Sequence, residues 1–358
     1  MIDVIVAGAG PAGSVAALVL ARAGARVWLL EREALPRPKL CGDTINPGAV
    51  ATLASLGLAG GPLDGACRLD GMVVSGPRVE VRGAYPAGQV ALALPRARFD
   101  LWLAEAAVAA GARLECRVRV RGPIWSESGA VAGVETGRAD GHVVRVPALL
   151  TIAADGRRSV LARAARLSRH PSAPRRWAFG VYATDVAGMA SMGEMHVRPR
   201  HYVGLAPLGS GVTNVCVVTG ARPAGRTPID VMRIALDSDA RLRERTAAWR
   251  PIGPPRVLGP LAVDVDSAGC PGLVLAGDAA GFVDPMTGDG LHLAIRGGVL
   301  AAQAALEALE AGDVMHAAAR LTARRREVLG AKLRFNRWLR RLVESSVAMD
   351  VVGAGARI

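Results

Sequence analysis

Aromatic residues and lysine are both scarce in this chain of 358 residues. Phenylalanine, tryptophan and tyrosine together make up 4% of it, and Lys39 and Lys332 are its only lysines, so arginine supplies almost all of the positive charge. So few aromatic side chains leave little to stack on single-stranded nucleic acid. The arginines are spread through an Ala- and Gly-rich sequence, so we expect no nucleic-acid partner in spite of the net charge of +13.

Long apolar runs and paired cysteines are also missing. No uninterrupted apolar stretch approaches the roughly 20 residues of a membrane-spanning helix. An apolar run begins already at Ile2, so we expect no signal peptide. The cysteines are odd in number and lack metal-ligand spacing, which predicts reduced thiols, a cytoplasmic location and no metal site. They are Cys41, Cys67, Cys116, Cys216 and Cys270.

The first 31 residues have the pattern of a dinucleotide-binding unit. Ile2 to Ala7 is an apolar run that predicts a buried strand, residues 14–23 predict a helix, and residues 26–30 predict a second strand. Gly-Ala-Gly-Pro-Ala-Gly, residues 8–13, joins the first strand to the helix. Glu31 follows about 20 residues later, which is the spacing of the dinucleotide fingerprint.

Each glycine of this turn has a physical role. Gly8 permits a tight turn, Gly10 lets a pyrophosphate approach the backbone, and Gly13 lets the helix pack closely on the strand. The helix N-terminus favours the anionic phosphates, and Glu31 can accept hydrogen bonds from ribose hydroxyls. We therefore expect the dinucleotide to contact Gly8, Gly10, Pro11, Ala12, Gly13, Glu31 and Arg32.

The rest of the chain mixes such βαβ pieces with runs typical of antiparallel strands. Periodicity predicts helices at residues 47–56, 96–110 and 291–311. Short alternating runs predict antiparallel strands within residues 69–94 and 179–219. The predicted fold class is therefore α/β, a Rossmann-type domain with a parallel central sheet, into which an antiparallel-sheet domain is inserted.

Two later motifs each end a predicted buried strand. The first is Asp155-Gly156, and the second is the run Gly-Asp-Ala-Ala-Gly at residues 277–281. The second continues through Asp-Pro-Met-Thr-Gly-Asp-Gly, residues 284–290, into a predicted helix. Together with the first glycine turn and Lys-Leu-Cys-Gly at residues 39–42, this set resembles the p-hydroxybenzoate-hydroxylase branch of glutathione-reductase-type FAD proteins. Within that branch it is most similar to the geranylgeranyl-reductase-related flavoproteins.

The residues of the second motif suit a flavin on physical grounds as well. The carboxylate of Asp278 can accept hydrogen bonds from ribityl hydroxyls, and Gly288 allows close approach of the backbone. Gly290 and Leu291 begin a helix whose N–H groups can face the electron-rich pyrimidine edge of a reduced flavin. We therefore predict FAD as the cofactor.

The resemblance implies further FAD contacts. Arg96 matches the family's FAD-contacting arginine, with Arg98 as the alternative, and Val120 matches the position that meets the adenine. Asp155 matches an acid that supports the pyrophosphate region, although it can also simply end a strand. Backbone contacts are implied for Ala12, Cys41 and Gly42.

The order of the predicted elements divides the chain into three parts. They are an FAD-binding domain of residues 1–68, 95–178 and 255–312, an antiparallel-sheet substrate domain of residues 69–94 and 179–254, and a C-terminal helical segment of residues 313–358.

Three side chains are candidates for catalysis. Cys41 lies in a loop that often reaches the flavin in this family, or is a small buried side chain. His292, at a helix start, can donate a proton or serve structurally. Tyr202 begins a run that resembles the family's Tyr-x-Trp-x-Phe-Pro motif, with Gly204 and Ala206 in place of the later aromatics. That replacement argues against a prenyl-lipid substrate and indicates room for a bulkier or ring-shaped one.

These features predict an FAD-dependent oxidoreductase that acts on a hydrophobic, unsaturated or aromatic small molecule. It either reduces a double bond or, as the alternative, hydroxylates an aromatic or polyketide-type substrate through a flavin hydroperoxide. A second alternative is a non-catalytic electron carrier. Because the chain has one credible dinucleotide fingerprint, NAD(P)H or another reductant would have to bind transiently.

The C-terminal segment predicts a long amphipathic helix. Val314, Leu321, Val328, Phe335, Leu342 and Met349 are spaced seven apart, and arginines surround them. Such a helix can lie on an anionic membrane surface, contact a partner through residues 313–350, or pack on its own protein with a solvated arginine face. The location is then cytoplasmic, or peripheral to the inner membrane face. The oligomeric state is not indicated.

Overall fold

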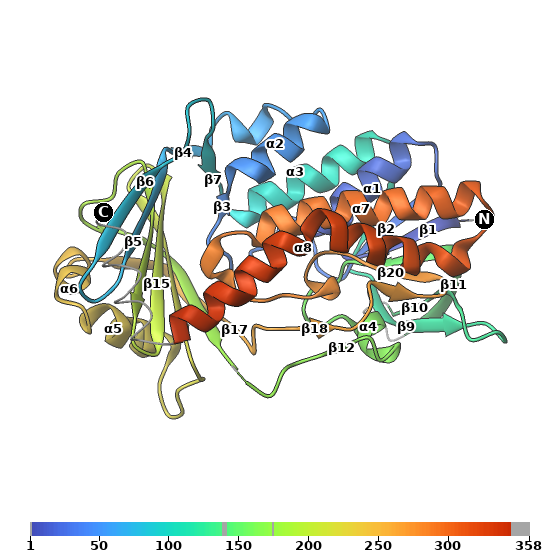
Figure 1. The fold of residues 1–358 in the computed structure, drawn as a ribbon. Coiled ribbons are helices and arrows are strands. Elements are labelled where there is room, and N and C mark those ends of the chain that lie inside the picture. Colours follow the sequence, from blue (N-terminus) through green and yellow to red (C-terminus); the bar gives the residue numbers. More distant parts are fainter. Residues whose placement is uncertain (1, 138–141, 174, 345–358) are drawn as a thin grey trace.

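The computed structural model of the chain describes residues 2–137, 142–173 and 175–344. An eight-stranded sheet forms its centre (Figure 1). Five of its strands run parallel, in the order β20 (Leu273–Leu275), β11 (Val143–Ala153), β1 (Ile2–Ala7), β2 (Val27–Glu31) and β8 (Arg113–Cys116). The other three are β19 (Gly269–Cys270), which pairs antiparallel with β20, and β9 (Arg119–Trp125) and β10 (Val131–Gly137), which continue antiparallel from β11.

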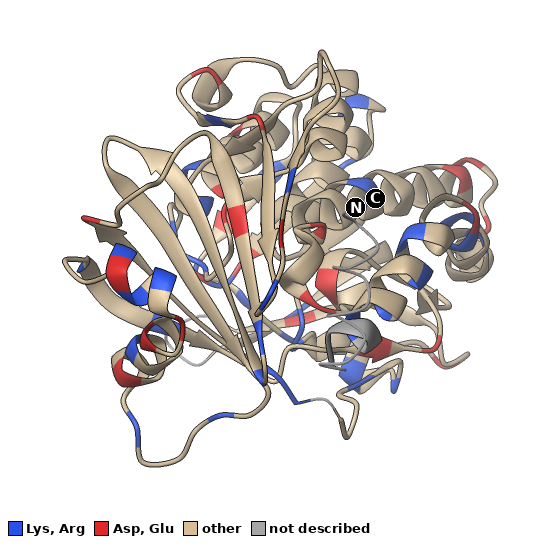
Figure 2. Ribbon diagram, turned by 60° about the vertical axis from the view of Figure 1, so that its left-hand side comes forward, with Lys and Arg blue, Asp and Glu red and all other residues tan. Residues whose placement is uncertain are grey.

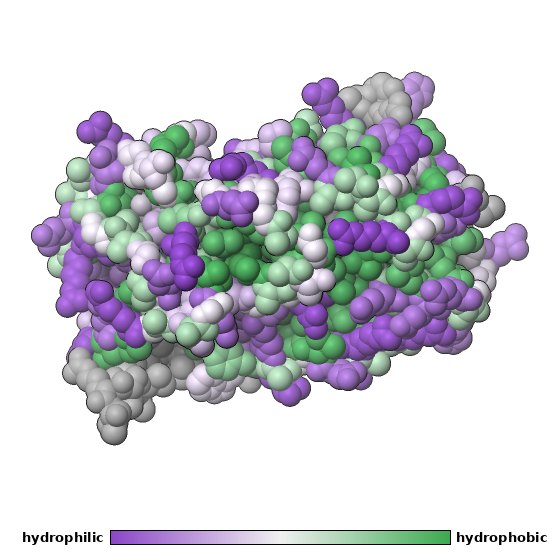
Figure 3. All heavy atoms as spheres, turned by 90° about the horizontal axis from the view of Figure 1, so that it is seen from above, coloured by the Kyte–Doolittle hydropathy of each residue, from purple (hydrophilic) through white to green (hydrophobic). Residues whose placement is uncertain are grey.

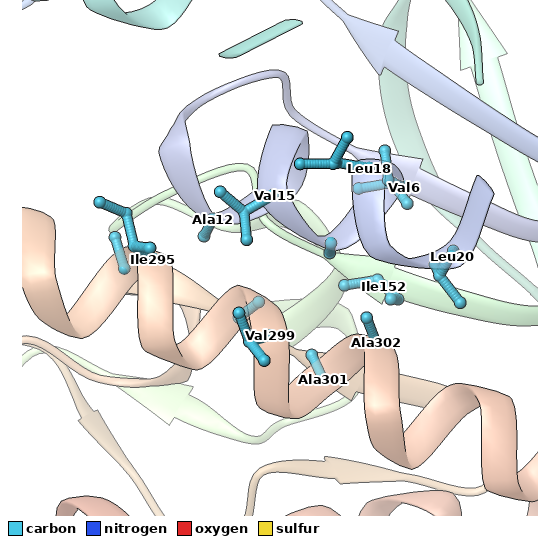
Figure 4. Close-up of a cluster of buried hydrophobic side chains, with 14 of the residues drawn as sticks. Val6, Ala12, Val15, Leu18, Leu20, Ile152, Ile295, Val299, Ala301 and Ala302 are labelled. Carbon is cyan, nitrogen blue, oxygen red and sulfur yellow. The ribbon is translucent and has the colours of Figure 1, made fainter. Parts of the chain in front are cut away.

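One face of this sheet is covered by three helices, α1 (Pro11–Arg22), α3 (Arg96–Ala109) and α7 (Gly290–Glu310). Side chains of β1 alternate between the faces, so Val4 and Val6 pack under these helices. Figure 4 shows Val15 of α1 and Val299 of α7 meeting above the sheet. The two helices approach closely at Gly298, which has no side chain to separate them. A Cβ at this position would lie 2.4 Å from the carbonyl oxygen of Ala12.

The other face is covered by the β9–β10 hairpin and by α4 (Val160–Ala164). Ile5 and Ala7, the alternate residues of β1, belong to this second core and are fully buried there. Because both faces are covered, the central strands are continuous apolar runs, as expected of a parallel sheet.

A seven-stranded sheet forms the second domain. Figure 1 shows it at the end of the molecule opposite the N-terminus, and Figure 2 shows Lys and Arg scattered over both domains. Helices α5 (Pro228–Asp237) and α6 (Ala240–Arg245) lie on one of its faces. The strand order is β17 (Arg250–Leu258), β13 (Trp177–Thr184), β16 (Val212–Thr219), β15 (His201–Gly209), β14 (Met192–Arg198), β5 (Gly71–Ser75) and β6 (Glu80–Ala84).

A small three-stranded sheet stands apart from both domains' sheets. Its strands are β3 (Thr44–Ile45), β7 (Ala91–Ala93) and β4 (Cys67–Leu69), and α2 (Pro47–Ser55) follows β3 directly. The arrangement as a whole confirms the predicted α/β class with an inserted antiparallel-sheet domain. The division predicted at residues 254/255, however, falls inside β17, which belongs to the seven-stranded sheet along its whole length.

The C-terminal segment forms the predicted long helix, α8 (Ala317–Glu344). Its sevenfold apolar seam is not buried throughout. Leu321 is fully buried, whereas Val328 is 40% and Phe335 is 54% exposed. Within the described part of the seam, Leu321 thus packs on the protein while Val328 and Phe335 face solvent. Met349 lies outside the described residues. Among the helices that are described, none is apolar over a length sufficient to span a bilayer.

Candidate functional site

Four strands of the central sheet end side by side. The register pairs Ala7 of β1 with Leu30 of β2 and with Ala153 of β11, and it pairs Ala153 with Leu275 of β20. The residues that follow these strand ends are therefore neighbours, although they are far apart in the sequence. They include Gly8, Glu31, Asp155 and Asp278. In open α/β sheets, ligands bind at this carboxyl edge.

The glycines of the first turn separate into packing and binding positions. A Cβ at Gly13 would lie 1.9 Å from the carbonyl oxygen of Gly8, and a Cβ at Gly8 (φ +102°) would lie 2.5 Å from that of Ala154. A Cβ at Gly10 would meet nothing closer than Nη2 of Arg37, at 3.7 Å. Gly8 and Gly13 are thus required by backbone packing, while the space at Gly10 is open to a ligand.

A cavity runs from this turn to the seven-stranded sheet. Its wall includes both the N-terminus of α1 and the loop that leads into α7. Many of the residues predicted to bind the cofactor or to act in catalysis line it. These are Gly10, Pro11, Ala12, Cys41, Gly42, Arg96, Tyr202, Asp278, Gly288, Gly290 and Leu291.

Two helix N-termini supply hydrogen-bond donors to this cavity. Within the described residues, neither α1 nor α7 has a side-chain cap at its N-terminus, so first-turn N–H groups are left for a ligand. Lys39 and Arg157 add positive charge to the same wall, and Asp278 adds a carboxylate. Thr287, also in the wall, has a buried hydroxyl without a hydrogen-bond partner in the described structure. These groups fit the phosphates, ribityl chain and ring of FAD.

Arg96 belongs to a buried chain of charges behind this wall. It donates to both oxygens of Asp100, at 2.6 and 2.8 Å, and Asp100 is fully buried. Arg37 donates to Asp100 at 3.1 Å and to Glu31 at 3.1 Å. Arg96 lines the cavity, whereas Arg98 is exposed and outside its wall; contact of Arg96 with FAD stays a prediction.

Glu31 serves the protein's own turn. Its Oε2 accepts from the Ala9 N–H and from Arg37, and its Oε1 accepts from the Glu33 N–H, each at 3.1 Å. The side chain is 4% exposed and lies outside the cavity wall. The carboxylate therefore fixes the glycine turn to the end of β2. A contact with the ribose stays a prediction.

The Cys41 loop is attached to the second domain by hydrogen bonds. The carbonyl oxygen of Cys41 accepts from Asn214 Nδ2 at 2.7 Å and from Cys216 Sγ at 3.4 Å. Asp43 Oδ2 accepts from Tyr182 at 2.7 Å and from Asn214 Nδ2 at 2.8 Å. These bonds hold the loop at the junction of the two domains.

Burial governs the ionisation of this loop. Burial raises the pKa of Asp43 to about 7, although the hydrogen bond from Tyr182 acts to lower this pKa. It also raises the pKa of the Cys41 thiol, with the charge of Arg96 acting in the opposite direction. Burial and then Arg96 lower the pKa of Lys39. Cys41 is therefore a protonated thiol at neutral pH. In the described structure all five cysteines are free.

Tyr202 forms part of the cavity wall with its ring. Its hydroxyl donates to Asp284 Oδ1 at 2.7 Å, and Arg176 donates to Oδ2 of the same carboxylate at 2.8 Å. The hydroxyl is thus engaged by the protein, which favours a structural role over the predicted catalytic one. Gly204 and Ala206, two and four residues on along β15, line the cavity as well.

His292 lies outside the cavity wall. Its Nδ1 accepts a hydrogen bond from Lys332 Nζ at 3.0 Å. Burial and then the charge of Lys332 lower the pKa of His292 to about 4, so the ring is neutral at physiological pH. A neutral imidazole has only its N–H proton and is a poor acid. A structural role is therefore favoured for His292 over proton donation.

Three predicted FAD contacts lie at the margin of the site. Arg32 is exposed and pairs with Glu33 at 3.5 Å, and Val120 is half-buried on β9. Asp155 Oδ2 accepts from the Val160 N–H at 2.9 Å, while its Oδ1 is buried without a partner among the described residues. Asp155 therefore ends its strand structurally and keeps one oxygen available. Cofactor contacts of all three stay predictions.

Several important residues were missed by the sequence analysis. Asp100 lies four residues after Arg96 on a predicted helix, a spacing that could have suggested the ion pair. Arg157 directly follows Asp155-Gly156 and could have been included with that motif. Tyr182 and Asn214 gave no signal, because they reach the site only through the pairing of β13 and β16.

The fold and the cavity define a flavoprotein with a Rossmann-type FAD site. Comparison with known proteins agrees: the FAD binding domain family matches residues 1–329. Menaquinone reductase of Mycolicibacterium smegmatis is 33% identical over 317 residues, which cover 84% of this chain and 75% of that relative. Digeranylgeranylglycerophospholipid reductase 2 of Methanopyrus kandleri is 35% identical over 337 residues, covering 87% of this chain and 78% of that relative. The chain belongs to this family of FAD-dependent oxidoreductases, which confirms the resemblance to geranylgeranyl-reductase-related flavoproteins.

Solved structures share the fold. A geranylgeranyl bacteriochlorophyll reductase-like protein of Thermoplasma acidophilum superposes with a TM-score of 0.84 at 24% identity, over 98% of this chain and 90% of that one. The myxobacterial chondrochloren halogenase, also described as FAD-dependent, gives a TM-score of 0.81 at 24% identity, over 93% and 81%. The fold is therefore common to reductases and halogenases and does not distinguish their reactions.

Proposed function

We propose that this flavoprotein reduces a carbon–carbon double bond in the isoprenoid chain of a lipid or prenylated quinone. The observation that carries the proposal is an apolar chamber that continues directly from the flavin loop. Its wall on the sheet side is made by alternate residues of neighbouring strands, which point away from α5 and α6. The strand residues of this wall include Ala178, Met195, Gly204, Ala206, Val218 and Leu258, and Leu261, Phe282 and Met286 from outside the sheet line the chamber as well.

The chamber is wide at the positions where the related motif has aromatic residues. A Cβ at Gly204 would have Met195 Cε at 3.7 Å as its nearest neighbour, so the space above the strand is open. This room supports a substrate that is broader than a bare prenyl chain. The names of the relatives support the same class, since one acts on menaquinone and another on a digeranylgeranyl lipid.

Reduction of a double bond requires a hydride and a proton. FAD, when bound and reduced, supplies the hydride. Cys41 lines the cavity and holds its proton at Sγ, because burial raises the pKa of its thiol. We assign to this thiol the delivery of the proton to the substrate carbon. The buried guanidinium of Arg96 would then stabilise the thiolate that is left.

NAD(P)H, or another reductant that binds transiently, would restore the reduced cofactor. This part of the proposal rests on the sequence, in which one dinucleotide fingerprint is present and is used by FAD. Comparison of NADH, NADPH and dithionite as reductants under identical conditions identifies the donor.

The reaction is tested with a short-chain prenylated naphthoquinone under anaerobic conditions, with dithionite as reductant. We expect a product heavier by two hydrogen atoms. In heavy water both added atoms should be deuterium bound to carbon, because dithionite supplies only electrons and both hydrogens come from solvent-exchangeable positions. A product that appears only in air and carries an added oxygen atom would establish the hydroxylase instead. Absence of any product with each reductant, in protein that contains FAD, would leave the electron-carrier alternative.

The role of Cys41 is tested by Cys41→Ala and Cys41→Ser, with Cys116→Ser as the control outside the cavity. Loss of the proton donor should lower kcat by about 100-fold in the alanine variant, the usual contribution of a positioned acid. FAD absorbance should be unchanged. Equal kcat in all three variants would remove Cys41 from the mechanism without affecting the proposed reaction.

A further inference from the structure

We propose that the C-terminal half of α8 is a docking surface for an anionic phospholipid bilayer. Apolar side chains form an exposed stripe along it, which we call the α8 stripe: Val328, Ala331, Phe335 and Trp338. Phe335 and Trp338 are each 54% exposed, and their rings lie 5.9 Å apart. Spacings of three and four residues place all four on one side of the helix.

Arginines border this stripe. Arg334 flanks the stripe directly, three residues after Ala331 and four before Trp338, and Arg337 follows one turn further on, while Arg326 lies farther round the helix. All three are exposed, and no acidic side chain of the described structure pairs with them. The neighbouring cations on the protein side are different, because Arg324 pairs with Glu307 and Lys332 pairs with Asp289. The rim of the α8 stripe is thus the part of the helix that has free positive charge to offer to phosphate groups.

Apolar surface by itself does not identify a docking site, since hydrophobic side chains are also exposed on the face shown in Figure 3. Large aromatic side chains beside arginines on one helix are the composition of helices that lie in a membrane interface. A protein partner would instead favour an apolar centre with few charges. The charge of the rim therefore selects an anionic lipid surface as the occupant.

The position of this helix relative to the cavity would bring a docked bilayer close to the substrate chamber. Leu339, one helical turn after Phe335 at the edge of the α8 stripe, packs against the cluster of apolar residues that includes Tyr202 and Met286 of the cavity wall. Lys332 contacts Asp289 at the start of α7, at 2.8 Å. Figure 1 shows α8 running along the molecule towards the second domain. A bilayer bound to the stripe would lie close to the chamber that takes the isoprenoid substrate, a point that rests on the proposed function.

The proposal is tested by co-sedimentation of the FAD-loaded protein with vesicles of equal parts phosphatidylglycerol and phosphatidylcholine, and with vesicles of phosphatidylcholine alone. We expect binding to the mixed vesicles and its loss in high salt. Arg334→Glu and Arg337→Glu should each weaken binding by at least about fivefold, since each arginine near an anionic surface contributes about that factor. Phe335→Ser with Trp338→Ser should abolish binding at low salt as well.

Matched controls exist elsewhere on the chain. Trp125→Ser removes a tryptophan that is 45% exposed on β9, and Arg166→Glu with Arg226→Glu reverses two exposed charges away from α8. These variants should bind the vesicles like the unchanged protein. Far-ultraviolet circular dichroism and FAD content verify that each variant is folded.

Three outcomes would overturn the proposal. They are no binding of the unchanged protein to mixed vesicles, equal loss of binding in the control variants, and a dimer in solution that the Phe335→Ser and Trp338→Ser changes convert to a monomer. Turnover of a short-chain, water-soluble prenylated quinone is measured in parallel. Retained turnover without vesicle binding rejects the docking surface alone, and vesicle binding without turnover rejects the proposed function alone.

Discussion

Asp100 binds Arg96 through two hydrogen bonds, of 2.6 and 2.8 Å, directly behind the cavity wall. Arg37 donates to the same carboxylate and joins it to Glu31. Two carboxylates and two guanidinium groups thus balance one another in a region where Asp100 has no exposed surface. Each group is needed by its neighbours, because a buried charge without a partner is costly.

Asp100→Asn should therefore destabilise the protein strongly. It leaves Arg96 and Arg37 without their shared carboxylate, and we expect the free energy of unfolding to fall by about 3–5 kcal/mol. Urea unfolding followed by circular dichroism measures the change. Asp3→Asn is the control, since Asp3 pairs with the exposed Arg26 and its loss should have a much smaller effect. Equal losses in the two variants would contradict the importance of the buried chain.

The glycines at positions 10 and 13 should respond differently to the same substitution. Gly10→Ala adds a Cβ that meets only ordinary contacts, so the protein should fold but lose FAD affinity by at least about tenfold. Gly13→Ala forces a Cβ to 1.9 Å from a backbone oxygen, so we expect a loss of about 3 kcal/mol or more, or insoluble protein. Thermal melts and FAD titration separate the two effects. A Gly10→Ala protein that binds FAD normally would show that the pyrophosphate lies elsewhere.

Asp43 should make stability depend on pH. The unfolded chain releases this proton near pH 4, whereas the folded protein keeps it up to about pH 7. The folded state therefore loses stability as the pH rises through that window, by up to about 4 kcal/mol. Asp43→Asn mimics the protonated acid and should lack this loss. We expect the difference in unfolding free energy between the variant and the unchanged protein to grow in favour of the variant between about pH 5 and pH 8. A difference that is constant with pH would assign Asp43 an ordinary pKa.

Tyr202→Phe should affect stability more than turnover. The change removes the hydroxyl that donates to Asp284 and keeps the ring in the cavity wall. A lost hydrogen bond to a charged acceptor should cost about 2 kcal/mol, and kcat should stay within about twofold. Tyr85→Phe is the matched control, because it alters another tyrosine of the same cavity. A Tyr202→Phe variant of normal stability without turnover would restore the catalytic role predicted from the sequence.

The parts of the site that could be predicted are those in which one residue has one local task. Gly8 directly follows an apolar strand, Gly13 lies in the first turn of the helix after it, and Asp278 follows β20 by three residues. The physics of a strand end and a helix start is contained in a few such neighbouring residues. The predicted helices at residues 96–110 and 291–311 agree with α3 and α7 to within a residue at each end. Local patterns therefore predicted the FAD-binding domain and its strand–turn–helix elements.

The parts that could not be predicted depend on contacts between distant segments. Asn214 reaches the Cys41 loop from a strand 173 residues away in the sequence. The carboxylate of Glu31 was expected to face a ribose, but Arg37 and two backbone N–H groups already bind it. The sevenfold apolar pattern predicted the helix α8. It could not predict how far the neighbouring elements extend along that helix, and this extent determines that Leu321 is buried while Phe335 is exposed.

The close contact between Gly298 and Ala12 has a consequence for how the cofactor is received. The two helices that it holds together are the ones whose uncapped N-termini face the cavity. With no side chain between them, neither helix can slide without the other. The spacing of these two helix N-termini is therefore set by the protein's own packing, so the two sets of free N–H groups are held in place before any ligand binds.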